Sequence, residues 1–208
     1  MRPDDDLTAA VVAHRRLIDV LGEVTDDVAR RPSLLPDWTV GHVLTHIARN
    51  ADSFTRVFDG AARGELWERY PGGDAQREAD IEAGAGRSAA ELADDVAGSI
   101  EQLEKAWANA TPEAWDGYFL APAGGPNERL DSIPSRRRRE VECHTADLAL
   151  GYTYFDWPDD YIAEELRRFV AARGALPGAI AERTPSEQAA WVMGRLQVEG
   201  VAAAGQWY

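Results

Sequence analysis

Three of the four histidines lie in two short windows of the sequence, and their spacing suits metal binding. His42 and His46 are four residues apart, and so are Glu140 and His144. In a helix, residues at this spacing stand one above the other on the same face. Imidazole and carboxylate groups bind Zn²⁺, Ni²⁺ or Fe²⁺, and helical bundles often build metal sites from facing helices. The two windows therefore predict a site for a divalent metal ion.

The hydrophobic pattern around these windows selects three of the four side chains as ligands. At about 100° per residue, the apolar residues between 43 and 58 form one stripe; His46 lies at its edge, while His42 lies further toward solvent. In the second window, apolar residues flank Glu140 and His144, which places both side chains toward the core. His46, Glu140 and His144 are therefore the predicted metal ligands. Three protein ligands leave one position open, as a catalytic zinc ion requires.

A structural interpretation of the same residues stays open. Histidine and carboxylate pairs at this spacing are also common on helix surfaces, where each contributes a few tenths of a kcal/mol. Asp147 would then cap a surface pair, whereas in a metal site it would hold a ligating imidazole in place. Glu142 points nearly opposite to Glu140 and is expected to be solvated. Cys143 lies about 100° from His144 around the helix and is expected to be a small buried residue, not a nucleophile.

Helices with an apolar periodicity would position these side chains. They are predicted at about residues 4–30, from 37 or 39 to 64, and at 88–107, 134–151 and 158–174. The segments 65–87 and 116–132 are predicted as loops, because glycine and charged residues interrupt the pattern. Residues 186–195 are predicted as a short helix, and residues 196–201 as a strand and turn.

Four long helices with medium connections favour a mainly α protein built as an antiparallel four-helix bundle. We predict that residues 1–155 form this bundle. Residues 156–208 are predicted to form a small C-terminal α/β appendage with helices and a short strand or turn.

Composition excludes several classes of partner. The 208 residues include 22 Lys and Arg against 36 Asp and Glu, which gives a net charge of −14 and argues against nucleic acid and anionic membranes as partners. No apolar run approaches the ~18 residues of a membrane span, and the acidic N-terminus is unlike a targeting signal, so a cytoplasmic protein is expected. The single cysteine, Cys143, excludes an internal disulfide and a Cys-based zinc motif. The composition is compatible with a monomer or a homodimer.

Two of these motifs resemble a known family. Residues 35–51, LPDWTVGHVLTHIARNA, resemble the second helix of the DinB-like bundle superfamily and, more narrowly, of the mycothiol-dependent maleylpyruvate isomerases. In that family the metal-binding histidine stands eight residues after a tryptophan, which matches Trp38 and His46. A second signature, Arg-Glu-x-x-x-His-x-x-Asp-Leu, matches residues 139–148. A third likeness is the pair Gly194-Arg195 before a Gly-rich stretch and Trp207.

The resemblance implies a metal- and thiol-dependent enzyme. Zinc or another divalent metal would sit on His46, Glu140 and His144, and the cofactor mycothiol, a low-molecular-weight thiol, would bind it as a thiolate. In the isomerases, that thiolate adds to the cis double bond of maleylpyruvate, the carbon–carbon bond rotates, and the thiolate leaves to give the trans isomer. The substrate is a small-molecule anion with two carboxylates, so a cationic residue is needed beside it.

Arg195 is the predicted catalytic residue, because the family carries a functional arginine in such a pair and a guanidinium matches a carboxylate. The alternative is a surface arginine at the end of a short helix. The run of four arginines at 136–139 is expected to be a solvated helix start, within which Arg137 shares a face with Glu140. The segment before Arg195 is shorter than in the family's isomerases. Two other functions therefore stay open: a mycothiol S-transferase that conjugates electrophiles, and a non-enzymatic bundle that binds a metal or a small molecule.

Overall fold

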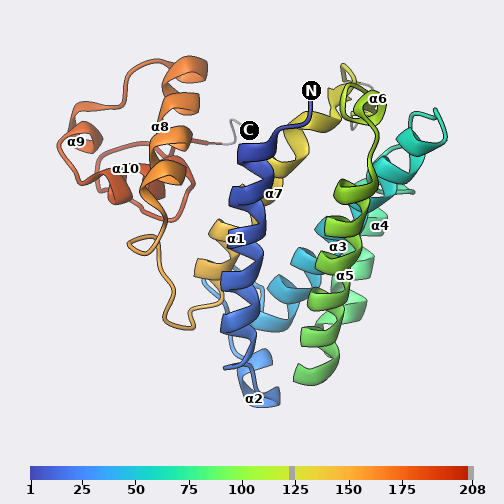
Figure 1. The fold of residues 1–208 in the computed structure, drawn as a ribbon. Coiled ribbons are helices and arrows are strands. Elements are labelled where there is room, and N and C mark those ends of the chain that lie inside the picture. Colours follow the sequence, from blue (N-terminus) through green and yellow to red (C-terminus); the bar gives the residue numbers. More distant parts are fainter. Residues whose placement is uncertain (122–124, 206–208) are drawn as a thin grey trace. The chain divides into compact units, whose positions relative to one another are not determined.

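The structure is a computed structural model that describes residues 1–121 and 125–205. Its contacts divide the chain into two compact units, Met1–Leu150 and Gly151–Tyr208. The first unit contains the four long helices α1 (Asp4–Leu21), α3 (Val40–Ala62), α5 (Ala89–Asn109) and α7 (Ile133–Asp147) (Figure 1). Helix α1 packs against α7 and α5, and α3 packs against α5 and α7. The prediction of a mainly α protein with a four-helix bundle is confirmed.

Two groups of buried apolar side chains fill the bundle. One group lies around the start of α3 and includes Leu17, Leu44 and Ile47. The other lies around its end and includes Phe54 and Trp115, whose neighbour Phe58 packs edge-on against Trp115. The two groups hold α3 along its whole length, which fixes the direction of the polar side chains between them.

Side-chain caps define where the bundle helices begin. Thr39 caps α3 by accepting a hydrogen bond from the backbone N–H of His42, and the His42 side chain accepts one from the backbone of Thr39 in return. Ser88 and Glu91 form the same reciprocal arrangement at the start of α5. Each such cap satisfies backbone N–H groups that have no partner inside the helix. The predicted first helix ends earlier than expected and is followed by the short α2 (Asp26–Ala29).

The predicted loop 65–87 is wrong, because it contains a further helix, α4 (Gly73–Ala85). Helix α4 returns the chain along α3, so that α3 and α5 run in the same direction (Figure 1). Glycines allow the two helices to approach closely. A Cβ atom on Gly41 would collide with the carbonyl oxygen of Ala85, and one on Gly84 would collide with the side chain of Thr45. Gly84, one of the glycines that indicated a loop, therefore allows α4 to pack closely against α3.

The predicted loop 116–132 includes some regular structure. It contains the two-residue strands β1 (Tyr118–Phe119) and β2 (Glu128–Arg129), which pair antiparallel with Tyr118 opposite Arg129. The short helix α6 (Pro112–Trp115) precedes the pair, and the 3₁₀ turn Leu130–Ser132 joins it to α7.

The second unit contains α8 (Asp159–Arg173), α9 (Gly178–Ala181) and α10 (Pro185–Val192). Its core includes Phe169 of α8, which packs edge-on against Trp191 of α10 at 5.6 Å between ring centroids. Residues 196–201 form no strand, so that prediction is wrong. Trp207, which belongs to the third likeness to the family, lies outside the described residues. Among the described helices, none is long and apolar enough to span a membrane.

Candidate metal centre

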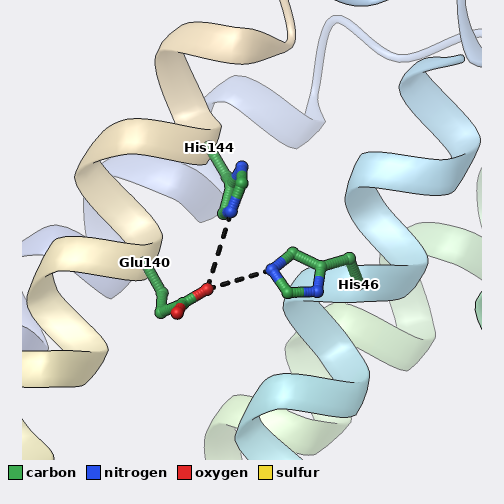
Figure 2. Close-up of side chains that lie close together, drawn as sticks. All are labelled: His46, Glu140 and His144. Carbon is green, nitrogen blue, oxygen red and sulfur yellow. Dashed lines mark hydrogen bonds and ion pairs between the residues drawn. The ribbon is translucent and has the colours of Figure 1, made fainter. Parts of the chain in front are cut away.

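The three predicted ligands meet between two bundle helices. His46 projects from α3, and Glu140 and His144 project from the facing turns of α7 (Figure 2). One ligand atom from each residue lies within 4.8 Å of the other two. Nε2 of His46 is 2.9 Å from Oε2 of Glu140, and Nε2 of His144 is 3.5 Å from the same oxygen. Residues 94 positions apart in sequence are thus brought together, although their role as metal ligands stays a prediction.

Glu140 is an ionised carboxylate in this arrangement. Burial alone would raise its pKa, but hydrogen bonds from His144 and His46 hold the pKa well below its usual range. The two imidazoles differ from each other. Burial, with the neighbouring His144, lowers the pKa of His46 to about 4. For His144, burial is outweighed by hydrogen bonds to Asp147 and Glu140, which raise the pKa. The centre therefore combines one neutral imidazole, one more basic imidazole and one negative charge.

Asp147 orients His144. The carboxylate of Asp147 is buried and accepts a hydrogen bond from Nδ1 of His144 at 2.8 Å. This contact fixes the ring so that Nε2 faces Glu140. Ligating histidines usually have such a partner on the other ring nitrogen, because it fixes the tautomer and makes the ligand more basic. Of the two interpretations of Asp147, the structure favours a residue that holds the imidazole.

The ring nitrogens of His42 contact residues outside the candidate centre. Its Nδ1 accepts from the backbone N–H of Thr39 at 3.2 Å, and its Nε2 lies 3.1 Å from Glu82. The ring of Trp38 lies between the two histidines of α3, 6.2 Å from the His42 ring and 5.6 Å from that of His46. His42 thus caps a helix, and Trp38 packs against His46.

The donor set fits a divalent metal ion. Two imidazole nitrogens and one carboxylate oxygen form a common catalytic zinc set, with one position open. Glu140 supplies the negative charge, and Asp147 supplies the partner for one ligating ring. A half-buried carboxylate between two imidazoles also agrees with the tendency of charges removed from water to be paired or to bind metals.

Two expectations about α7 are wrong. Glu142 was expected to be solvated, but it is buried and accepts a hydrogen bond from Arg16 of α1 at 2.7 Å. Arg137 was expected in a solvated helix start, yet it is fully buried among α1, α3 and α7. Both side chains face neighbouring helices, because α7 packs against α1 on one side and α3 on another. Cys143 is buried, as predicted.

Arg195 lies in the second unit, at the C-terminal end of α10. Its backbone N–H donates to Ala190 O at 2.7 Å, and its Nη1 donates to Met193 O at 2.6 Å. These contacts fix the residue within its own unit. Its catalytic role stays a prediction.

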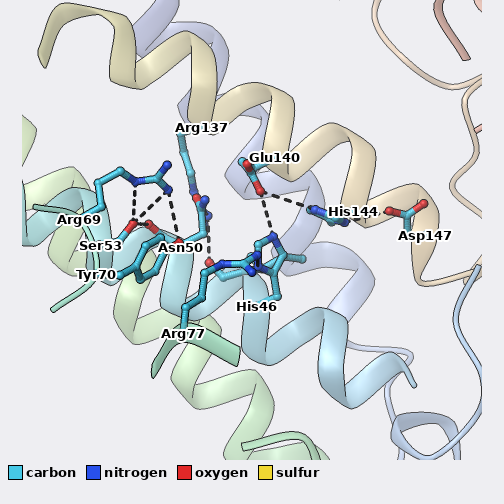
Figure 3. Close-up of polar contacts among 11 residues, drawn as sticks. His46, Asn50, Ser53, Arg69, Tyr70, Arg77, Arg137, Glu140, His144 and Asp147 are labelled. Atoms are coloured by element: carbon cyan, nitrogen blue, oxygen red, sulfur yellow. Dashed lines mark hydrogen bonds and ion pairs between the residues drawn. The ribbon is translucent and has the colours of Figure 1, made fainter. Parts of the chain in front are cut away.

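Three polar residues of the bundle were not singled out from the sequence. Arg77 of α4 donates from Nη2 to Nδ1 of His46 at 2.9 Å, and Arg69 lies nearby in the connection before α4 (Figure 3). His14 of α1 is buried; it stacks on Trp107 and contacts both Arg137 and Glu104. The acceptor for Arg77 lies 31 residues away, and that for Arg137 lies 123 residues away. Only the helix packing reveals such contacts.

His14 is expected to make the stability of the protein depend on pH. Burial lowers its pKa to about 4 from an ordinary value of 6.5. The folded state therefore disfavours the protonated ring, so the contribution is complete above pH 6.5 and is lost as the pH falls toward 4. Between pH 7 and pH 5 this group alone should cost about 2 kcal/mol of unfolding free energy.

The variant His14→Gln isolates this effect. Its amide can accept from Arg137 and donate to Glu104, but it does not titrate. Urea unfolding of metal-free protein at pH 7 and pH 5 should show a loss about 2 kcal/mol larger in the original protein than in the variant. Equal losses in the two proteins would contradict the assignment.

Comparisons with known proteins support the helical-bundle fold. The family described as mycothiol maleylpyruvate isomerase N-terminal domain matches residues 11–149. The crystal structure of the mycothiol-dependent maleylpyruvate isomerase aligns with a TM-score of 0.75 and 25% identity, over 82% of this chain and 70% of that one. A histidine-to-alanine mutant of that enzyme aligns with the same TM-score and coverage at 24% identity. No curated protein matches the chain.

The helical arrangement therefore defines a DinB-like bundle. More narrowly, the match over residues 11–149 shows that this chain belongs to the mycothiol maleylpyruvate isomerase family, as the resemblance of its two helical motifs predicts.

Proposed function

We propose that this protein is a metal- and mycothiol-dependent isomerase of maleylpyruvate or a related small acid. The observation that carries the proposal is the convergence of His46, Glu140 and His144, with Asp147 behind His144, in a chain of this family. Zinc or another divalent ion would be held by these three side chains. Such an ion would lower the pKa of a bound thiol and so supply a thiolate nucleophile at neutral pH.

The residues of the chain prepare this site. Glu140 contributes a negative charge that offsets part of the charge of a divalent ion. Asp147 keeps Nε2 of His144 directed toward Glu140, and Trp38 covers one side of His46. During isomerisation, the cis double bond of the substrate becomes a single bond when sulfur adds, rotates, and re-forms as trans when the thiolate leaves. No electrons or protons are gained overall, so no further co-reactant is required.

The test is an isomerisation assay with maleylpyruvate. We expect turnover to fumarylpyruvate with zinc-loaded protein and mycothiol, and none when mycothiol is omitted or the metal is removed by chelation. Conjugation of an electrophile such as monobromobimane to mycothiol, without isomerisation, would replace the proposal by a mycothiol S-transferase. If metal-loaded protein showed neither activity, the proposal would be replaced by a non-enzymatic bundle that binds a metal or a small molecule.

Cys143→Ser is expected to keep full metal content and most of the activity. The proposal assigns the nucleophile to an added thiol, and the Cys143 thiol is buried on α7, 3% exposed. Metal analysis and the isomerisation assay test this expectation. A folded, metal-loaded Cys143→Ser protein without turnover would show that the protein's own thiol takes part.

A further inference from the structure

A pocket of about 600 Å³ lies beside the candidate metal centre, between α3, α4 and the connection that joins them. Five arginines line it: Arg49, Arg56, Arg69, Arg77 and Arg87. The pocket belongs entirely to the first unit. In a chain with a net charge of −14, such a concentration of positive charge needs an explanation.

Acidic side chains compensate two of the five arginines. Arg49 pairs with Asp52 and Asp95, and Arg87 pairs with Asp95. The carboxylate of Asp80, which also lines the pocket, accepts a hydrogen bond from Gln76.

The other three arginines have neutral partners instead, and Arg56 among them donates to the backbone oxygen of Glu68. Arg69 donates to the hydroxyl of Ser53 at 3.1 and 3.2 Å and to that of Tyr70 at 3.4 Å. Its guanidinium lies 4.1 Å from the ring centroid of Phe54. Arg77 donates to Nδ1 of His46. Within the described part of the chain, neither guanidinium forms an ion pair with a carboxylate.

Arg137 provides a further guanidinium, close to Arg69, and the nearby carboxylates of Glu140 and Asp52 favour its charge. It donates to Nε2 of His14 and to the oxygens of Ile47 and Asn50 at 2.9 to 3.0 Å. Its Nη2 has no hydrogen-bond partner within the described residues, although the side chain is fully buried. Figure 3 shows Arg137 reaching Asn50, Arg69 reaching Ser53 and Tyr70, and Arg77 reaching toward His46. A buried donor without a partner costs free energy, so it is a place where a ligand oxygen would be favourable.

We propose that this arginine pocket binds a carboxylate of the substrate, with Arg69 and Arg77 as the binding residues and Arg137 supporting them from beneath. The proposal rests on the proposed function, since it names the place that holds the anion of that reaction. A guanidinium presents paired N–H donors that match a carboxylate, and hydrogen bonds between charged groups are the stronger ones. An anion here would also offset the repulsion between Arg69 and Arg137.

Arg77 connects the pocket to the metal centre. A neutral imidazole carries one proton, so Nδ1 of His46 accepts from Arg77 only while Nε2 carries that proton. If Nε2 of His46 held a metal ion, the ring proton would lie on Nδ1, and Arg77 would be available to an anion in the pocket.

Calorimetric titration with maleate, a cis dicarboxylate, tests the proposal without thiol or turnover. Arg69→Gln and Arg77→Gln should each weaken maleate binding to zinc-loaded protein on the order of tenfold to a hundredfold. The matched control is Arg63→Gln, which removes the same charge from an arginine that stacks on Trp67 outside the pocket lining. It should leave maleate binding within twofold, and all three variants should keep their zinc.

The outcomes separate this inference from the proposed function. Loss of maleate binding in Arg69→Gln and Arg77→Gln, but not in Arg63→Gln, supports the anion site even if no isomerisation is found. Unchanged maleate affinity in both pocket variants overturns it, even if the protein isomerises maleylpyruvate. Equal weakening in all three variants would also overturn it, because the effect would then reflect net charge alone. A titration with inorganic phosphate that binds as tightly as maleate would show a site for any anion and contradict the assignment to carboxylates.

Discussion

His144→Ala is expected to remove most of the divalent metal bound by this protein. Only His46 and Glu140 would remain as ligands, and two ligands are too few for tight retention. Loss of a residue that merely orients a ligand already weakens metal binding about 10- to 100-fold. Removal of a ligand itself should therefore exceed about 100-fold. Elemental analysis after dialysis measures the effect, and mycothiol-dependent turnover should fall with the metal content.

His42→Ala is the matched control for this prediction. It removes a histidine from the same region, but one whose ring nitrogens contact Thr39 and Glu82 instead of Glu140. Metal stoichiometry should stay at one per chain, while the cap of α3 is weakened. A full complement of metal in His144→Ala would rule out the proposed centre. Loss of metal in His42→Ala would show that the choice between the two histidines of α3 is wrong.

The positions of these two histidines illustrate what a sequence can predict. The apolar stripe of α3 runs from residue 43 to residue 58, so its phase separates His46 from His42 by a simple angle. In α7 the pattern is weaker, but apolar residues still flank Glu140 and His144. Local periodicity therefore predicted that these three side chains face the core, and the family motifs added the pairing of the two helices.

Helix α4 shows why periodicity fails elsewhere. Among its 13 residues, Ile81 is the one large apolar side chain, so no stripe marks a buried face. Glycines near its end resemble loop residues, but they permit close packing against α3. Helix formation here depends on the neighbouring helix more than on the local pattern. The arginine pocket was missed for this reason, since Arg77 lies on that helix.

Buried charged residues escaped prediction for a different reason. Glu142 and Arg137 were assigned from their own helix alone, as if α7 had one buried face. In the bundle, α7 contacts both α1 and α3, and the partners Arg16 and His14 lie more than 100 residues earlier in sequence. A pattern within one helix contains no information about such partners. It predicts which face is apolar, not which charges the other faces will meet.

Arg195→Ala is expected to lower kcat/KM for an anionic substrate about 30- to 1,000-fold. The estimate assumes that Arg195 forms a desolvated, bidentate contact with a carboxylate, which is worth roughly 2–4 kcal/mol in the transition state. Metal content and thermal stability should barely change, because Arg195 is neither a proposed ligand nor a core residue.

The structure supplies a competing explanation for Arg195. Its Nη1 donates to the backbone oxygen of Met193. This contact caps the C-terminal end of α10 and does not depend on substrate. Arg195→Lys separates the two roles. Lysine keeps the charge but lacks the planar pair of donors, so a bidentate contact would lose most of its effect, whereas a local cap would be largely preserved. If both variants keep kcat/KM within about twofold of the original protein, Arg195 only completes its helix. We would then expect the arginine pocket of the first unit to bind both carboxylates of the substrate.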